Sequence, residues 1–110
     1  MRWYERLRRS SEIAFVRRRG RQVSLACLTG YAVTARQSRT SVAVTVAKPV
    51  GGAVTRNLVR RRIRGALDAT QPLPVPLRIL FVAKPAAAAA SYERLEGEVG
   101  DLLARLSARP

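Results

Sequence analysis

Residues 53–69 restrict how this chain can fold more than any other segment does. They carry Arg56, Arg60, Arg61, Arg62 and Arg64 without a nearby acid before Asp68. An α-helix separates these charges from the apolar residues, because a turn of about 3.6 residues brings positions three and four apart onto one side. We therefore predict a helix over 53–69, with one narrow buried stripe. Its core positions are Val59, Ile63, Ala66 and Leu67.

The remaining surface of this helix is basic. Arg56, Arg60 and Arg64 form one row at a spacing of four residues, with Asn57 and Arg61 in a second row beside it. Arg62 lies on the opposite flank. Like charges four residues apart destabilise a helix by roughly 0.2–0.5 kcal/mol per pair. Bound phosphates would neutralise them, so the pattern favours a polyanionic partner over a merely solvated charged face.

The charge of the whole chain agrees with a nucleic-acid partner. Twenty-one Lys and Arg stand against seven Asp and Glu, for a net charge of +14. Twelve of the basic residues and none of the acids fall between Ile13 and Leu67, whereas four acids lie between Glu93 and Asp101. We expect the middle of the chain to meet nucleic acid and the acidic C-terminal segment to face water.

Gly51 and Gly52 precede the arginine helix. They can form a turn, and they can also let backbone N–H groups at the helix start approach a phosphate. The spacing does not match a Walker loop, because no Lys-Ser or Lys-Thr follows.

Three apolar segments predict strands. Residues 23–33 and 40–48 read as two strands paired antiparallel, with Val42, Val44 and Val46 facing the core. Residues 77–85, "LRILFVAKP", read as a strand buried on both faces. The prolines of 71–76 separate this strand from the arginine helix.

Two further helices complete the pattern. Ser10 or Ser11 can cap a short helix that ends near Gly20. Ser91 can cap a last helix, with Leu95, Val99, Leu102, Leu103 and Leu106 on its apolar side. The expected order is α-β-β-α-β-α in a single domain, residues 1–110.

The sequence contains little that could perform catalysis. It has no histidine, one cysteine (Cys27) and no paired acids in the basic region, which excludes a zinc site, a Ser-His-Asp triad and a two-metal nuclease centre. We expect no catalytic residue and no metal ligand. The chain has no long apolar run or signal-like start, so we expect a cytoplasmic protein without a membrane or small-molecule partner.

Three blocks in order resemble the protein subunit of bacterial ribonuclease P. They are "RLRRSSEIAFVRRRGR" at 6–21, "KPVGGAVTRNLVRRRIRGAL" at 48–67 and "ILFVAKPAAAAASYERLEGEV" at 79–99. The resemblance implies an α/β sandwich of the α+β class, with a central four-stranded sheet in the order α-β-β-β-α-β-α. One of the apolar segments would then split in two, and the arginine helix would form an unusual left-handed crossover between parallel strands.

The resemblance also implies a function. In this family a catalytic RNA removes the 5′ leader of precursor tRNA with Mg²⁺, while the protein binds the leader and supports the RNA. The implied partners are ribonuclease P RNA and precursor tRNA, and the metal belongs mainly to the RNA. The implied RNA-binding residues are Lys48, Gly51, Gly52, Arg56, Asn57, Arg60, Arg61, Arg62 and Arg64. The implied leader-binding positions are Ile13, Arg17 and Tyr31.

The sequence departs from the family pattern at three of these positions and at Leu58. Leu58 stands where a second Arg of Arg-Asn-Arg is usual, and Arg62 is its possible substitute. Gly52 replaces a common Asn, and Ile13 and Arg17 replace aromatics, although Arg17 could contact a phosphate or stack through its guanidinium. Tyr31 could also be an ordinary packing residue. The alternative function is a ribosomal or general structured-RNA-binding protein with no part in cleavage.

Overall fold

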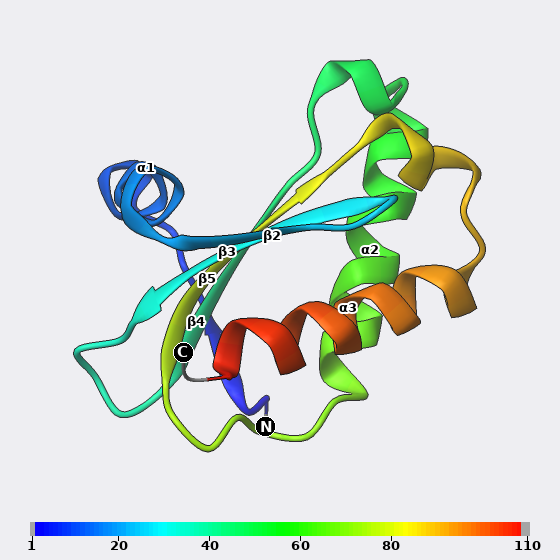
Figure 1. The fold of residues 1–110 in the computed structure, drawn as a ribbon. Helices are drawn as coiled ribbons and strands as arrows, with labels where there is room; N and C mark the ends of the chain where they lie inside the picture. The colour runs from blue at the N-terminus through cyan, green and yellow to red at the C-terminus, as the bar shows by residue number, and fades with distance from the viewer. Residues whose placement is uncertain (1, 109–110) are drawn as a thin grey trace.

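The computed structural model describes residues 2–108 and shows a mixed sheet covered on both faces (Figure 1). Five strands have the spatial order β1-β4-β5-β3-β2. Helix α1 (Ser10–Arg19) lies on one side of the sheet, and α2 (Ala53–Asp68) and α3 (Tyr92–Ser107) lie on the other. The strands are β1 (Tyr4–Arg6), β2 (Arg21–Ser24), β3 (Leu28–Thr34), β4 (Thr40–Thr45) and β5 (Leu77–Ala83).

Strand β5 is the centre of the sheet, as its apolar sequence predicts. Ile79 and Phe81 are fully buried in the core against α2 and α3, and Leu80 is buried on the α1 side. β5 is antiparallel to β3 and parallel to β4. β4, α2 and β5 therefore form the βαβ unit whose left-handed crossover the resemblance implies.

The predicted pairing of residues 23–33 with 40–48 is wrong. β5 lies between β3 and β4 at the middle of the sheet, where helices cover both of its faces. The segment 23–33 instead folds on itself as the β2–β3 hairpin, so the split that the resemblance implies is confirmed. Within β4 the predicted inward face is confirmed: Val42 is buried, and Val44 packs against the same core.

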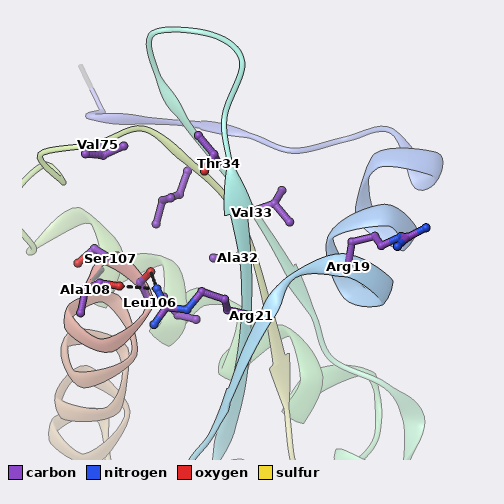
Figure 2. A pocket seen from close by; sticks show the side chains of 10 residues that line it. Arg19, Arg21, Ala32, Val33, Thr34, Val75, Leu106, Ser107 and Ala108 are labelled. Atoms are coloured by element: carbon purple, nitrogen blue, oxygen red, sulfur yellow. Dashed lines mark hydrogen bonds between the residues drawn. The ribbon is translucent and has the colours of Figure 1, made fainter. Parts of the chain in front are cut away.

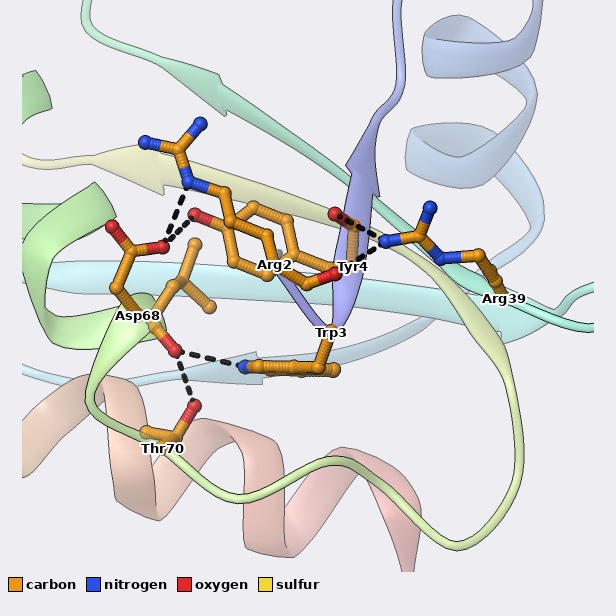
Figure 3. A network of polar contacts seen from close by, with 7 residues as sticks. Arg2, Trp3, Tyr4, Arg39, Asp68 and Thr70 are labelled. Atoms are coloured by element: carbon orange, nitrogen blue, oxygen red, sulfur yellow. Dashed lines mark hydrogen bonds and ion pairs between the residues drawn. The ribbon is translucent and has the colours of Figure 1, made fainter.

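The sheet has one strand more than the four expected. β1 runs parallel to β4 at the edge, with Tyr4 opposite Thr40 and Arg6 opposite Val42. Tyr4 and the preceding Trp3 contact α2 (Figure 3): Trp3 Nε1 donates to the carbonyl of Leu67 at 3.0 Å, and the Tyr4 hydroxyl donates to Asp68 at 2.7 Å. β1 thus brings the N-terminal segment beside α2.

The helix boundaries follow the sequence with one exception. α2 buries its four predicted core residues, and α3 begins at Ser91, whose hydroxyl accepts a hydrogen bond from the Arg94 amide at 3.1 Å. α1 ends at Gly20 as expected, but its N-cap is Arg9, and no side chain caps this end. Two 3₁₀ helices occupy Lys48–Val50 and Pro85–Ala89.

One acid of α3 does not face water as expected. Glu98 is buried, and its carboxylate accepts hydrogen bonds from the amides of Cys27 and Leu28 at 3.0 and 3.1 Å. Arg94 donates to the other oxygen at 3.0 Å. The side chain therefore satisfies the two backbone N–H groups of the β2–β3 turn, where an unpaired buried donor would be costly. Burial and the Glu98 carboxylate raise the pKa of the Cys27 thiol.

The other end of α3 is held by Arg21 of β2. Its guanidinium donates to the carbonyls of Arg105 at 3.2 Å and Leu106 at 3.3 Å. It also donates to the carbonyl of Ala108 (Figure 2). These carbonyls have no partner within the helix, and a cation is favourable beside this negative end.

Over residues 2–108, no helix has both the length and the apolar character needed to cross a membrane.

The contact between β1 and α2 gives a prediction at alkaline pH. Burial, and then the hydrogen bond to Asp68, raise the pKa of Tyr4 from 10.0 to about 12. A pKa raised by folding stabilises the native state below pH 10, and this contribution disappears as the pH rises through 12. The wild-type protein should lose roughly 2 kcal/mol of unfolding free energy over this window from Tyr4 alone.

We expect Tyr4→Phe to remove that part of the decline and to be about 1–2 kcal/mol less stable at neutral pH, because the hydrogen bond to Asp68 is lost. Urea unfolding between pH 7 and 12 measures both effects. The difference between the two proteins isolates Tyr4, since every other side chain is the same in each. Parallel alkaline curves would show that Tyr4 does not contribute.

Candidate nucleic-acid interface

The arginine helix α2 presents its basic side to solvent. Val59, Ile63, Ala66 and Leu67 anchor the opposite side in the core, with exposed fractions of 1% or less. Asn57 and Arg61 are exposed, and the row of Arg56, Arg60 and Arg64 is half-buried at the edge of the core stripe. The structure therefore places both predicted rows on one continuous surface.

No acid neutralises these arginines in the part of the chain that the structure describes. The ion pairs there join Arg2 to Asp68, Arg39 to Glu5, Arg94 to Glu98 and Arg105 to Asp101. The acids of α3 thus pair within their own helix. Asp68, the single acid of α2, is engaged by Arg2 and Tyr4. The basic side of α2 has a surplus of positive charge that an anion can satisfy.

A depression of about 650 Å³ is centred on this side. Four arginines line it: Arg60, Arg61 and Arg64 of α2, and Arg6 of β1. The other lining residues are Asn57, Val54 and Leu58. Arg60 Nη1 donates to Asn57 Oδ1 at 3.0 Å, which orients one guanidinium along the helix. The depression joins the predicted surface to the edge of the sheet.

The closely spaced positive charges of this surface affect the pKa of Arg64. Burial lowers the pKa of its guanidinium, and the positive charges of Arg6, Arg2 and Arg60 lower it further, against a smaller opposing effect of Tyr4. An arginine side chain stays protonated in proteins, so Arg64 is a cation here. A phosphate placed here would relieve both the burial cost and the repulsion.

The residues before α2 form a tight turn. Lys48 is exposed, and the Gly51 amide donates to its carbonyl at 3.0 Å. Gly51 has φ 156° and ψ −170°, a conformation that is essentially restricted to glycine, and a Cβ there would lie 3.0 Å from the Thr55 side chain. Gly52 is the N-cap and has open space around it, and no side chain caps this helix. The N-terminus of α2 is therefore accessible beside Lys48.

Arg62 is placed apart from these residues. It lies on the flank facing the segment before α3, where its Nη1 donates to the carbonyl of Ala90 at 2.9 Å. Its side chain is half-buried there. This contact links α2 to the start of α3, and it is separate from the depression.

The three predicted leader-binding residues lie together on the opposite face of the sheet. Ile13 of α1 and Tyr31 of β3 are half-buried against the small cluster of Leu7, Val16, Ala43 and Leu80. The guanidinium carbon of Arg17 lies 5.9 Å from the centre of the Tyr31 ring, within the range of a cation–π contact. α1 and the sheet thus present an aromatic ring covered by an exposed cation.

A second pair of the same kind lies nearby and was not predicted. Arg78 of β5 is placed over the ring of Phe15 with its guanidinium carbon 5.3 Å from the ring centre, and it also donates to the Thr34 carbonyl at 3.4 Å. Phe15 therefore lies beside the start of the central strand β5, on another side of α1 from Ile13 and Arg17. No group of three His, Cys, Asp or Glu side chains that could hold a metal occurs within residues 2–108.

The comparisons with known proteins agree with this geometry. The family model described as Ribonuclease P matches residues 1–107. The chain belongs to the ribonuclease P protein family. It is 43% identical over 105 residues to the ribonuclease P protein component of Acidothermus cellulolyticus, covering 93% of this chain and 88% of the relative. It is 39% identical over 107 residues to that of Beutenbergia cavernae, covering 94% and 89%.

Solved structures show the same fold. The RNase P protein of Staphylococcus aureus superposes with a TM-score of 0.84 at 18% identity, covering 94% of this chain and 97% of that one. The RNase P protein of Thermotoga maritima gives 0.82 at 16% identity, covering 92% and 96%. The expected fold class is thereby confirmed, although the strand count differs by one.

Within this ribonuclease P protein, sequence reasoning missed Arg6 as a member of the basic surface. Arg6 comes from β1, about fifty positions before the helix beside which it lies. The opening "RLRRS" shows only that the segment is basic and begins near the first helix. A parallel strand of three residues carries too weak a periodicity to be recognised.

Proposed function

We propose that this chain is the protein subunit of a ribonuclease P that removes the 5′ leader of precursor tRNA. It binds the catalytic RNA through Lys48, the Gly51–Gly52 turn and the α2 surface. It binds the leader between α1 and the sheet, at Ile13, Arg17 and Tyr31. The RNA performs the cleavage, and the protein works with it in the cytoplasm.

The observation that carries this proposal is the unneutralised arginine row of α2. Arg56, Arg60 and Arg64 repeat at about one helical turn, ~5.4 Å, which is comparable with the distance between phosphates along a strand. Guanidinium groups bind phosphate oxygens through paired hydrogen bonds, and their binding releases condensed counterions. Arg6 widens the row toward the sheet edge, so the surface can contact more than one strand of a folded RNA.

The second surface supports a role toward the leader. Tyr31 offers a ring for a sugar or base, and Arg17 offers a charge for a phosphate. These groups lie on the sheet face opposite α2, so one molecule can bind the catalytic RNA and the leader at the same time.

The described residues do not fit a magnesium site of their own. Mg²⁺ needs oxygen ligands, and no three carboxylates meet in residues 2–108. The acids on the two elements that form the basic surface, Asp68 of α2 and Glu5 of β1, are engaged by Arg2 and Arg39. We therefore assign the metal to the RNA partner, and the protein's own contribution is to bind and to position.

Reconstitution tests the proposal. Adding the purified chain to the ribonuclease P RNA of the same organism should raise the rate of precursor tRNA cleavage at low Mg²⁺, where the RNA alone folds and binds substrate poorly. The measurement is the rate of leader release across a Mg²⁺ series, with and without protein. A general RNA-binding protein would bind the RNA equally well and leave cleavage unchanged, and that result would reject the proposal.

The same reconstituted enzyme separates the two surfaces. Wild-type holoenzyme should bind precursor tRNA more tightly than mature tRNA, because only the precursor has a leader. Tyr31→Ala should reduce this preference while leaving the affinity of the protein for the catalytic RNA unchanged. Equal loss of both affinities would indicate that Tyr31 is a packing residue instead.

A further inference from the structure

Two large apolar side chains are exposed within residues 2–108, and both lie in the middle of the basic surface. Val54 is 84% exposed and Leu58 is 38% exposed. They are four residues apart on α2, so they are neighbours on the helix surface, and both line the depression beside Arg6. Isolated exposed apolar residues are ordinary, but this adjacent pair is surrounded by cations.

The arginines around Val54 and Leu58 restrict the chemistry of a ligand that could bind there. Arg60, Arg61 and Arg64 surround it along α2, and Arg6 borders it from the sheet edge. None of these four takes part in an ion pair within the described chain. An occupant must therefore be anionic at its rim and apolar on one flat side. The volume of about 650 Å³ lies within the range of roughly 300–1,000 Å³ that is usual for small-ligand sites.

We propose that this depression binds one unstacked nucleotide of the RNA partner, with its base against Val54 and Leu58 and its phosphates on the surrounding arginines. The inference rests on the proposed function and specifies the kind of RNA element that α2 meets. A nucleobase has a flat apolar face, and a planar guanidinium group can stack on that face or donate hydrogen bonds to the base edge. The flanking phosphates supply the negative charge that the arginines require.

A continuous duplex would use this surface less well. Its bases are stacked inside, and it would press charged phosphates and hydroxyls onto Val54 and Leu58. A bulge or a single-stranded junction presents both a phosphate and a free base face. Asn57, an exposed member of the second row that also lines the depression, adds an amide that can reach a base edge.

The test compares RNA probes and matched variants of the full chain. Leu58→Ser removes the apolar contact without changing the charge, and Ala104→Ser makes the same kind of change at an exposed site on α3. The probes are a short single-stranded RNA, the same strand with one abasic ribose, and its duplex. Leu58→Ser should bind the single strand about five- to tenfold more weakly, while its salt dependence and duplex affinity stay unchanged.

A second variant adds charge at the same place. Leu58→Arg should steepen the salt dependence for every probe and reduce the preference for single strand over duplex. Ala104→Ser should behave as the wild type, and thermal unfolding confirms that the exposed substitutions preserve the fold. If Leu58→Ser and Leu58→Arg keep the wild-type preference, or if the abasic strand binds as tightly as the intact one, the nucleotide site is excluded. If removing the α2 arginines leaves RNA binding intact, the proposed function itself fails.

Discussion

The protein with Arg56, Arg60 and Arg64 replaced by alanine should bind its catalytic RNA about a hundredfold to a thousandfold more weakly than the wild-type chain. In the proposed complex each arginine donates charge-assisted hydrogen bonds to phosphate, which we expect to be worth about 1–1.5 kcal/mol per arginine after the loss of hydration is included. The three side chains are half-buried along one edge of the core stripe, and none is held by an acid in the described chain. Their removal should therefore change binding much more than stability.

The salt dependence distinguishes lost phosphate contacts from a general loss of charge. Each lost contact should reduce the slope of log affinity against log salt by roughly 0.7–0.9, so the triple variant should lose about two to three units. A control variant replaces Arg18 and Arg19 of α1 and Arg36 after β3, which are exposed and pair with no acid in residues 2–108, and so removes the same net charge. If control and triple variant lose equal affinity and equal slope, α2 is not the RNA-binding surface.

The arginine helix could be predicted from the sequence because its information is local. The 3.6-residue period of Val59, Ile63, Ala66 and Leu67 assigns the buried side, and the arginines must then take the other. The cap at Ser91 is likewise a signal within one turn. The start of the first helix is harder to predict, because Ser10 and Ser11 both suit an N-cap. In the structure the N-cap is Arg9, and the helix begins at Ser10.

The arrangement of the strands could not be predicted from local pattern. Residues 23–33 and 40–48 are each suited to a sheet, but their neighbours are decided by β5, which follows them in the chain and separates them in space. The break between β2 and β3 at Ala26–Cys27 contains no Gly or Pro. Its backbone is stabilised by Glu98, seventy residues away, so the sequence near the turn gives no sign of it.

The candidate RNA-binding surface likewise has a part that local sequence predicts and a part that depends on tertiary structure. Sequence identified the α2 rows, and the structure added Arg6 and the adjacent pair of Val54 and Leu58. When the helix is considered alone, Leu58 is only a position where the arginine that is usual in the family is missing. Beside Arg6 it becomes part of a lined depression, because tertiary structure brings β1 to that side of α2.

Replacing Glu98 with alanine should lower the free energy of unfolding by about 3–5 kcal/mol, a large part of the 5–15 kcal/mol that is usual for a domain. The carboxylate is 7% exposed and accepts hydrogen bonds from Cys27, Leu28 and Arg94. Alanine leaves two backbone N–H groups of the β2–β3 turn without a partner in a buried place. Urea unfolding at neutral pH measures the loss.

A matched substitution one turn away separates this effect from the loss of a surface charge. Asp101 pairs with Arg105 at 2.9 Å, but both side chains are about half exposed, so Asp101→Ala should cost less than about 1 kcal/mol. Glu98→Gln keeps one acceptor oxygen for the turn and should fall between the two. Because the damage is confined to the turn, the amides of Cys27 and Leu28 should exchange with solvent faster in Glu98→Ala, and the buried thiol should become reactive. Equal stability of Glu98→Ala and Asp101→Ala would mean that the turn holds its own conformation, and that α3 is fixed to the sheet by its apolar side alone.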